Sequence, residues 1–150
     1  MPDAAPDETT PLVTQPTEPT TRKMSNTSAT TYWRVGAVYG AAAVCLGAFG
    51  AHGLKSRGIT EAKLASWSTA THYLLTHSVA LLIARDNSLA AGLFTAGMTM
   101  FSGSIYALIL NPQLRILGPV TPIGGLCLIG GWVALAFGKG PSVPAGDLRL

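Results

Sequence analysis

Residues 36–50 decide the fold, and they read GAVYGAAAVCLGAFG, with no charged side chain. Small residues recur in this stretch every three or four positions, at Gly36, Gly40, Ala43, Gly47 and Gly50. At 3.6 residues per turn they share one face of a helix. In hydrocarbon no hydrophobic effect drives helix against helix, so close approach through small residues is a main route to association. The stretch therefore predicts a membrane helix that packs closely against another helix.

Four apolar stretches approach the length of about 20 residues that the core of a bilayer requires. They run over residues 34–52, 64–84, 89–110 and 121–137. The third carries a second stripe of small residues, at Gly92, Ala96, Thr99, Gly103 and Ala107. The sequence predicts an all-α fold, an integral membrane four-helix bundle with a disordered N-terminal tail.

The second and fourth stretches carry further expectations. The second can span a membrane only if its polar side chains face the bundle, namely those of Ser66, Thr69, His72 and His77. In the fourth, Thr121 is expected to cap the helix, with Pro122 at the first helical position.

Composition agrees with a membrane protein. Hydrophobic residues make up 48% and charged residues 11% of the 150 residues, and the mean hydropathy is +0.37. Such values lie far from those of an average soluble domain. Single basic residues lie beside the apolar runs, which suits phospholipid head groups and predicts membrane lipid as a partner. They are not clustered as nucleic-acid binding requires, so no nucleic-acid partner is expected.

The chain divides into three parts. Residues 1–32 are rich in Thr and Pro without apolar periodicity, so they are expected to form a disordered polar tail. Residues 33–138 form the four-span membrane domain, and residues 139–150 form a short polar C-terminal tail. The positive-inside rule favours both termini inside. Basic residues on that side are Arg22, Lys23, Arg34, Arg85, Lys139 and Arg149, against Lys55, Arg57, Lys63 and Arg115 on the other.

No Asp or Glu falls within a span, which argues against a pump driven by a carboxylate. His77 lies mid-span and is expected either to hydrogen-bond to Tyr106, Ser102 or Ser104 across the bundle or to serve as a proton carrier or cofactor ligand. No pair of His or Cys residues has the spacing of metal ligands, and no Ser has both a base and an orienting acid. We therefore expect no catalytic residue, no cofactor, no metal and no enzyme activity.

Two sets of residues are the candidates for function. The candidate polar core comprises His52, Tyr73, His77, Ser102, Ser104 and Tyr106. Close helix packing is expected at Gly36, Gly40, Gly47, Gly50, Gly92, Gly103, Gly124 and Gly131.

Several short motifs occur in a fixed order along the chain. They are GAFGAHGL at 47–54, Trp67 followed by Tyr73, HSVALL at 77–82, FSGSIY at 101–106, TPIGG at 121–125 and GW at 131–132. With these motifs, residues 34–138 resemble the membrane family named domain of unknown function 423, which includes YgdD and transmembrane protein 256. The resemblance implies a four-helix integral membrane protein of bacterial inner membranes or, in animals, one associated with mitochondria. It implies no activity.

The leading hypothesis is a small integral membrane protein that acts by helix–helix association as an accessory, scaffold or assembly factor. Its partner would be a second copy or a larger membrane complex. The alternative is a carrier for a small solute or a proton, with a polar face around His77. The expected location is a membrane crossed several times: the mitochondrial inner membrane or an endomembrane in a eukaryote, the inner membrane in a bacterium.

Overall fold

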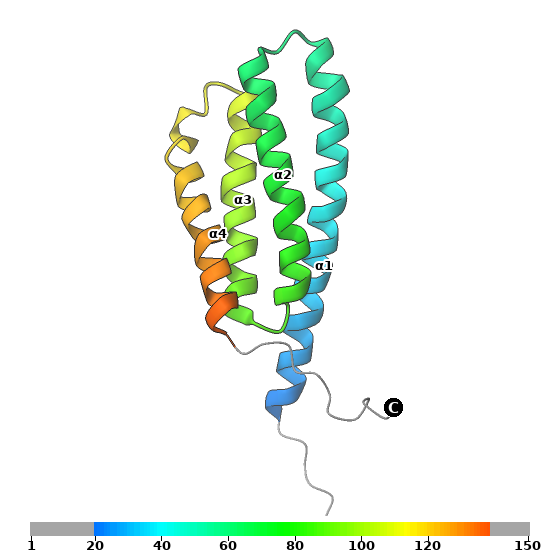
Figure 1. Cartoon of the computed structure of the whole chain (residues 1–150), viewed down its shortest axis with the longest axis vertical. Coiled ribbons are helices and arrows are strands. Elements are labelled where there is room, and N and C mark those ends of the chain that lie inside the picture. The colour runs from blue at the N-terminus through cyan, green and yellow to red at the C-terminus, as the bar shows by residue number, and fades with distance from the viewer. Residues whose placement is uncertain (1–19, 139–150) are drawn as a thin grey trace, which may run out of the picture.

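The computed structural model describes residues 20–138, with side chains described from Thr27 onward. All regular structure in this part of the chain is helical, and four long helices dominate it (Figure 1). The predicted all-α four-helix bundle is therefore confirmed. The elements are α1 (Thr20–Ala48), η1 (Phe49–Leu54), α2 (Glu61–Ala84), α3 (Ser88–Leu110), η2 (Arg115–Leu117) and α4 (Val120–Phe137).

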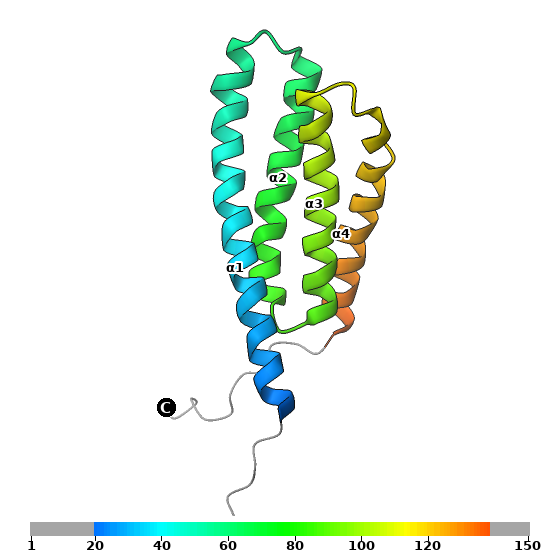
Figure 2. The same ribbon diagram turned by 180° about the vertical axis from the view of Figure 1, so that it is seen from behind.

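The helices run antiparallel and lie beside one another in chain order, as Figures 1 and 2 both show. The closest packing joins α3 to α4, α1 to α2 and α2 to α3, and α1 touches α3 to a smaller extent. The first and last helices make at most marginal contact with each other in the described residues. We call this arrangement the open row, with α1 and α4 at its two edges.

The start of α1 differs from the sequence prediction. The helix begins at Thr20, whereas the polar tail was expected to extend to Tyr32. Pro19 is the last of the prolines that precede this helix. Beyond it no residue fixes a non-helical backbone, and extending an existing helix is much easier than nucleating one. Residues 1–19 and 139–150 lie outside the described residues, so the rest of both predicted tails is untested.

The connections between helices are short. The chain passes from α1 into the single π-helical segment η1 and turns at Gly58, whose φ of 67° is a backbone conformation that glycine adopts without strain. Three residues join α2 to α3, and the last of them, Asn87, caps α3 by accepting a hydrogen bond from the backbone N–H of Ala90 at 3.1 Å. Such short connections force neighbouring helices to be antiparallel.

The start of α4 corrects a second expectation. The helix begins at Val120 after Pro119, and no side chain caps it. The hydroxyl of Thr121 lies instead 2.6 Å from the hydroxyl of Ser104 on α3. Thr121 is therefore one residue inside the helix, where its side chain joins two helices rather than closing the end of one.

Three helical segments of the described chain are long and apolar enough to cross a membrane, and α2 is not among them. They are Thr27–Leu54, Ser88–Leu110 and Arg115–Phe137. The helix α2 has the length to span but carries more polar side chains than any of these three segments. In the described residues the buried apolar core combines six alanines with nine larger side chains, including Trp67, Leu81, Phe94 and Met98.

Candidate functional site

His77 is buried in the bundle, and its ring makes two hydrogen bonds. Its side chain is only 6% exposed. Nδ1 lies 2.7 Å from the carbonyl oxygen of Tyr73, and Nε2 accepts a hydrogen bond from the indole N–H of Trp132 on α4 at 3.1 Å. A carbonyl oxygen only accepts and an indole N–H only donates, so the ring proton is on Nδ1. Both nitrogens of a neutral imidazole are thus engaged within the protein.

Aromatic rings surround His77 and join three helices. Trp132 and Phe94 pack edge to face with centroids 5.3 Å apart, and the His77 ring lies 5.8 Å from Phe94. Tyr73 stacks between His77, at 5.5 Å, and Phe101, at 4.7 Å. A hollow of about 470 Å³ lies beside these rings, between α2 and α4. We call it the α2–α4 hollow.

The expected hydrogen-bond partners of His77 lie elsewhere. Ser102 donates to the carbonyl of Ala70 at 2.8 Å, and Ser104 is the partner of Thr121. Tyr106 lies 3.1 Å from the hydroxyl of Thr71. Thr71 donates its only hydroxyl hydrogen to the carbonyl of Trp67, so Tyr106 is the donor in that pair. These side chains join helices as expected of polar contacts in membranes, but each does so separately.

His52 departs further from the expected polar core. It lies in η1 near the end of the bundle, and its side chain is exposed. Its place in the candidate polar core is therefore wrong. It was a candidate because it is an ionisable residue at the end of the first predicted span, but the π-helical segment changes the helical periodicity at this point and its side chain faces outward.

Trp67 was not among the candidate residues, yet its side chain makes a hydrogen bond and two ring contacts at the η1 end of the bundle. Its indole N–H donates to the carbonyl of Leu46 on α1 at 2.8 Å. Its ring packs against Tyr106 at 4.4 Å and Phe49 at 5.7 Å. A Cβ on Gly50 would lie 2.5 Å from Cδ1 of Trp67, so the indole occupies the space that the glycine leaves. The sequence signal that could have identified Trp67 was a glycine-rich turn followed by a Trp on the next helix.

The glycines of α1 face α2 at close range. A Cβ on Gly36 would lie 2.8 Å from Cδ2 of Leu82, and one on Gly40 would lie 3.3 Å from the hydroxyl of Ser78. At Gly47 the neighbour is a methyl group of Thr71, at 3.4 Å.

Close approach is tightest between α3 and α4. A Cβ on Gly124 would overlap the backbone nitrogen of Phe101, and one on Gly131 would lie 2.7 Å from the ring of Phe94. Gly97 on α3, absent from the candidates, meets Leu128 in the same way.

The stripe on α3 behaves differently from the other glycines. Gly103 has no atom within 4 Å of the position of a Cβ, so the expectation of close packing is wrong there. Gly92 has one distant neighbour, the hydroxyl of Tyr32 at 3.7 Å. Gly103 is exposed and lines a shallow hollow between α3 and α1, where the two helices are not in close contact.

Four polar side chains of α2 were expected to face the bundle, and three of them do not. Ser66, Thr69 and His72 are exposed on the outside of the bundle, and only His77 of the four faces inward. The inward face of α2 is already filled by Trp67 and the small and apolar residues that follow it at helical spacing. Ser66 and Thr69 donate to backbone carbonyls of their own helix, at 3.0 Å each.

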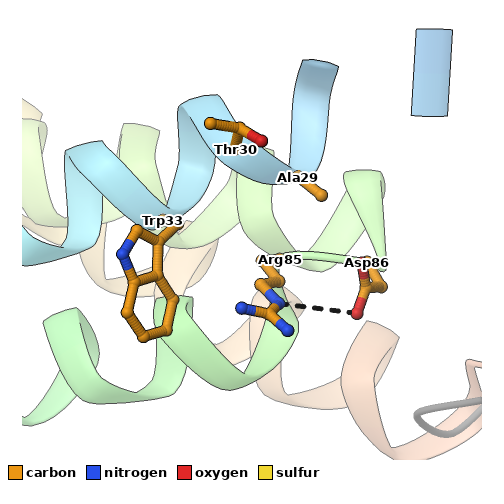
Figure 3. A pocket seen from close by; sticks show the side chains of 5 residues that line it. All are labelled: Ala29, Thr30, Trp33, Arg85 and Asp86. Atoms are coloured by element: carbon orange, nitrogen blue, oxygen red, sulfur yellow. Dashed lines mark ion pairs between the residues drawn. The ribbon is translucent and has the colours of Figure 1, made fainter. Parts of the chain in front are cut away.

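A second hollow, of about 450 Å³, lies between the N-terminal half of α1 and the α2–α3 connection (Figure 3). Arg85 extends its guanidinium over the ring of Trp33 at 5.2 Å, and its Nε lies 3.7 Å from a carboxylate oxygen of Asp86. Both charged side chains are about half exposed, so this pair contributes little to stability. An aromatic ring beside an arginine at the end of a membrane helix is typical of an anchor at the head-group level.

Within residues 20–138 the structure brings together no group of three or more His, Cys, Asp or Glu side chains that suits a metal ion. Cys45 is exposed, Cys127 is half-buried, and both are free thiols. What the described interior offers is hydrogen bonds and ring contacts between helices.

Comparison with known proteins assigns the family. The family model described as protein of unknown function (DUF423) matches residues 46–125, from the end of α1 to the first turns of α4. The chain belongs to this family. A UPF0382 membrane protein of Schizosaccharomyces pombe is 42% identical over 115 residues, which cover 70% of this chain and 98% of the relative. A UPF0382 membrane protein of Haemophilus influenzae is 39% identical over 117 residues, covering 72% and 92%.

These relatives show that the DUF423 chain is an integral membrane protein that crosses the membrane several times, in agreement with its three apolar helical segments. The UPF0382 membrane protein YwdK of Bacillus subtilis is a further relative, 36% identical over a stretch that covers 67% of the chain and 89% of the relative. No solved structure matches the chain. The family description gives no activity, so function has to be argued from the geometry.

Proposed function

We propose that the protein acts by association of its helices with other membrane helices, as an accessory, scaffold or assembly component of a larger membrane assembly. The open row carries this proposal, because it leaves both edge helices free along most of their length. Of the most apolar part of each, 17% is buried within the chain, against 33% for α3. A further helix can therefore pack on either edge without displacing any contact of the bundle.

The interior supports the same proposal by what its polar groups do. Every buried side-chain nitrogen and oxygen of the described residues has a hydrogen-bond partner. These partners are mostly on neighbouring helices or on the backbone, as in the pairs of Ser102 with Ala70 and Trp67 with Leu46. Satisfied buried polar groups stabilise one packing arrangement of the helices.

The alternative of a proton or solute carrier has less support. The α2–α4 hollow lies beside His77, as a carrier would require. Uptake of a proton by His77 would place a hydrogen on Nε2, however, and so break the bond from Trp132. Each transfer would thus cost a contact between α2 and α4.

Photocrosslinking in native membranes tests the association proposal. A photoreactive amino acid is placed at exposed positions on different faces: Val44 on α1, Leu126 on α4 and Thr76 on α2. We expect at least one face to yield a discrete protein adduct that persists when the tagged chain is expressed at its native level. Lipid adducts alone from all three faces would refute association as the function.

A further inference from the structure

We propose that the outer face of α2 is the contact between two copies of this chain in the membrane. This inference rests on the proposed function, association between membrane helices. It adds that the partner is a second copy of the chain and that the contact is made by the outer face of α2. It starts from the one helix whose composition does not suit exposure to lipid on its own.

The face is a line of exposed residues opposite the core. Its members repeat at intervals of four and three, so they form one nearly straight stripe along the helix. We call this stripe the α2 seam. It consists of Ala65, Thr69, His72, Thr76, Val79 and Ile83, all of them exposed.

The polar part of the seam lies at the middle of the helix. His72 is 11 residues after Glu61 and 12 residues before Ala84, the two ends of α2. Helix α2 lies between α1 and α3, which are long and apolar enough to cross a membrane, so α2 crosses the bilayer beside them and the imidazole of His72 is placed near the centre of the hydrocarbon. Within the part of the chain that the structure describes, neither the side chain of His72 nor that of Thr76 makes a hydrogen bond. Polar groups left unpaired in hydrocarbon are costly, so these two side chains need a partner outside the bundle.

A second copy of the chain provides that partner through its own seam. Neutral imidazole and hydroxyl groups each donate and accept, so His72 and Thr76 can each bond to the same residue of a second copy. Two copies share one orientation in the membrane, and a twofold axis along the membrane normal brings equal positions to equal depth. His72 then faces His72 of the other copy, and Thr76 faces Thr76. An acyl chain offers neither donor nor acceptor.

The shape of the surface suits the same pairing. His72 lines two hollows: the α2–α4 hollow on one side, and a hollow of about 330 Å³ between α1 and α2 on the other. The seam is therefore a ridge between two depressions. The ridge stands clear of the surfaces beside it, so the seams of two copies can meet without a clash from α1 or α4. The small side chains of Ala65 and Thr69 allow the two backbones to approach closely.

Cysteine crosslinking tests the proposal in native membranes. The background carries Cys45→Ala and Cys127→Ala, and single cysteines are then placed on the seam by Thr69→Cys, Thr76→Cys or Val79→Cys. In a twofold pair each of these cysteines faces its equivalent within disulfide distance, so mild oxidation should give a covalent dimer. Matched controls are Val44→Cys on α1 and Leu126→Cys on α4, whose native residues are 65% and 68% exposed. Dimers at the controls as readily as on the seam would overturn the proposal.

A second measurement uses energy transfer between labelled copies in liposomes. His72→Leu removes the donor and acceptor at an exposed site, so the monomer should stay folded while the dissociation constant of the dimer rises by about threefold or more. His72→Gln keeps both functions and should restore most of the affinity. An unchanged dissociation constant in His72→Leu would overturn the proposal. Crosslinking of the seam to a different protein would also overturn it and leave the proposed function standing.

Discussion

Gly124→Ala tests the close approach of α4 to the backbone of α3. The new Cβ would overlap the backbone nitrogen of Phe101 and lie 2.9 Å from both the carbonyl carbon and the Cβ of Met100. Favourable contact between carbon atoms begins near 3.5 Å, so α3 and α4 must separate by about 0.6 Å or more. Overpacking of this kind costs about 1–3 kcal/mol. Part of the cost is offset by the higher helix propensity of alanine, worth up to about 1 kcal/mol.

Gly103→Ala is the matched control, because it makes the same chemical change in a neighbouring helix where the new Cβ meets nothing within 4 Å. It should leave stability unchanged or raise it slightly. Subtracting the change in unfolding free energy of Gly103→Ala from that of Gly124→Ala removes the contribution of helix propensity. The remaining destabilisation should be about 1–3 kcal/mol. Reversible unfolding in mixed detergent micelles, followed by tryptophan fluorescence, measures both. Equal free energies of unfolding for the two variants would refute the packing argument.

Two further predictions concern hydrogen bonds between distant elements. A double-mutant cycle of His77→Phe and Trp132→Phe should give a coupling energy of about 0.6–1.7 kcal/mol in unfolding, and additive effects would show that their hydrogen bond stabilises nothing. Asn87→Asp keeps the acceptor for the N–H of Ala90 but removes the donor to the carbonyl of Ala134 at 3.0 Å. Asn87→Asp should therefore lower the free energy of unfolding by about 1 kcal/mol. Asn87→Ala loses both bonds and should lower it by about 2 kcal/mol. Equal losses of stability for the two variants in thermal unfolding would show that the two bonds do not contribute separately.

The sequence predicted the helices well because long apolar runs and polar breaks are local features. The predicted second and third spans, 64–84 and 89–110, end with α2 and α3 at Ala84 and Leu110. The start of α1 at Thr20 was missed because polar composition alone does not stop a helix that is already nucleated.

Contacts between helices were harder to predict, because they depend on relative depth and rotation. The sequence singled out His77 as a buried polar residue. Its partner Trp132, however, is 55 positions away on α4, and sequence periodicity does not determine the depth of that helix relative to α2. Gly103 and Gly124 are equally glycines in apolar helices, and only the rotation of each helix decides which one meets a backbone. His72 was expected to face inward because a polar group in a span usually does.

The open row also bears on how the protein is made. Helices α2, α3 and α4 each pack on the helix synthesised just before them, so the α1–α2 hairpin can close while later helices are still being translated. Contacts that are short in sequence also form quickly. Insertion then requires no rearrangement of helices already placed in the bilayer, and nascent chains arrested after α3 should already protect the α1–α2 contacts from protease.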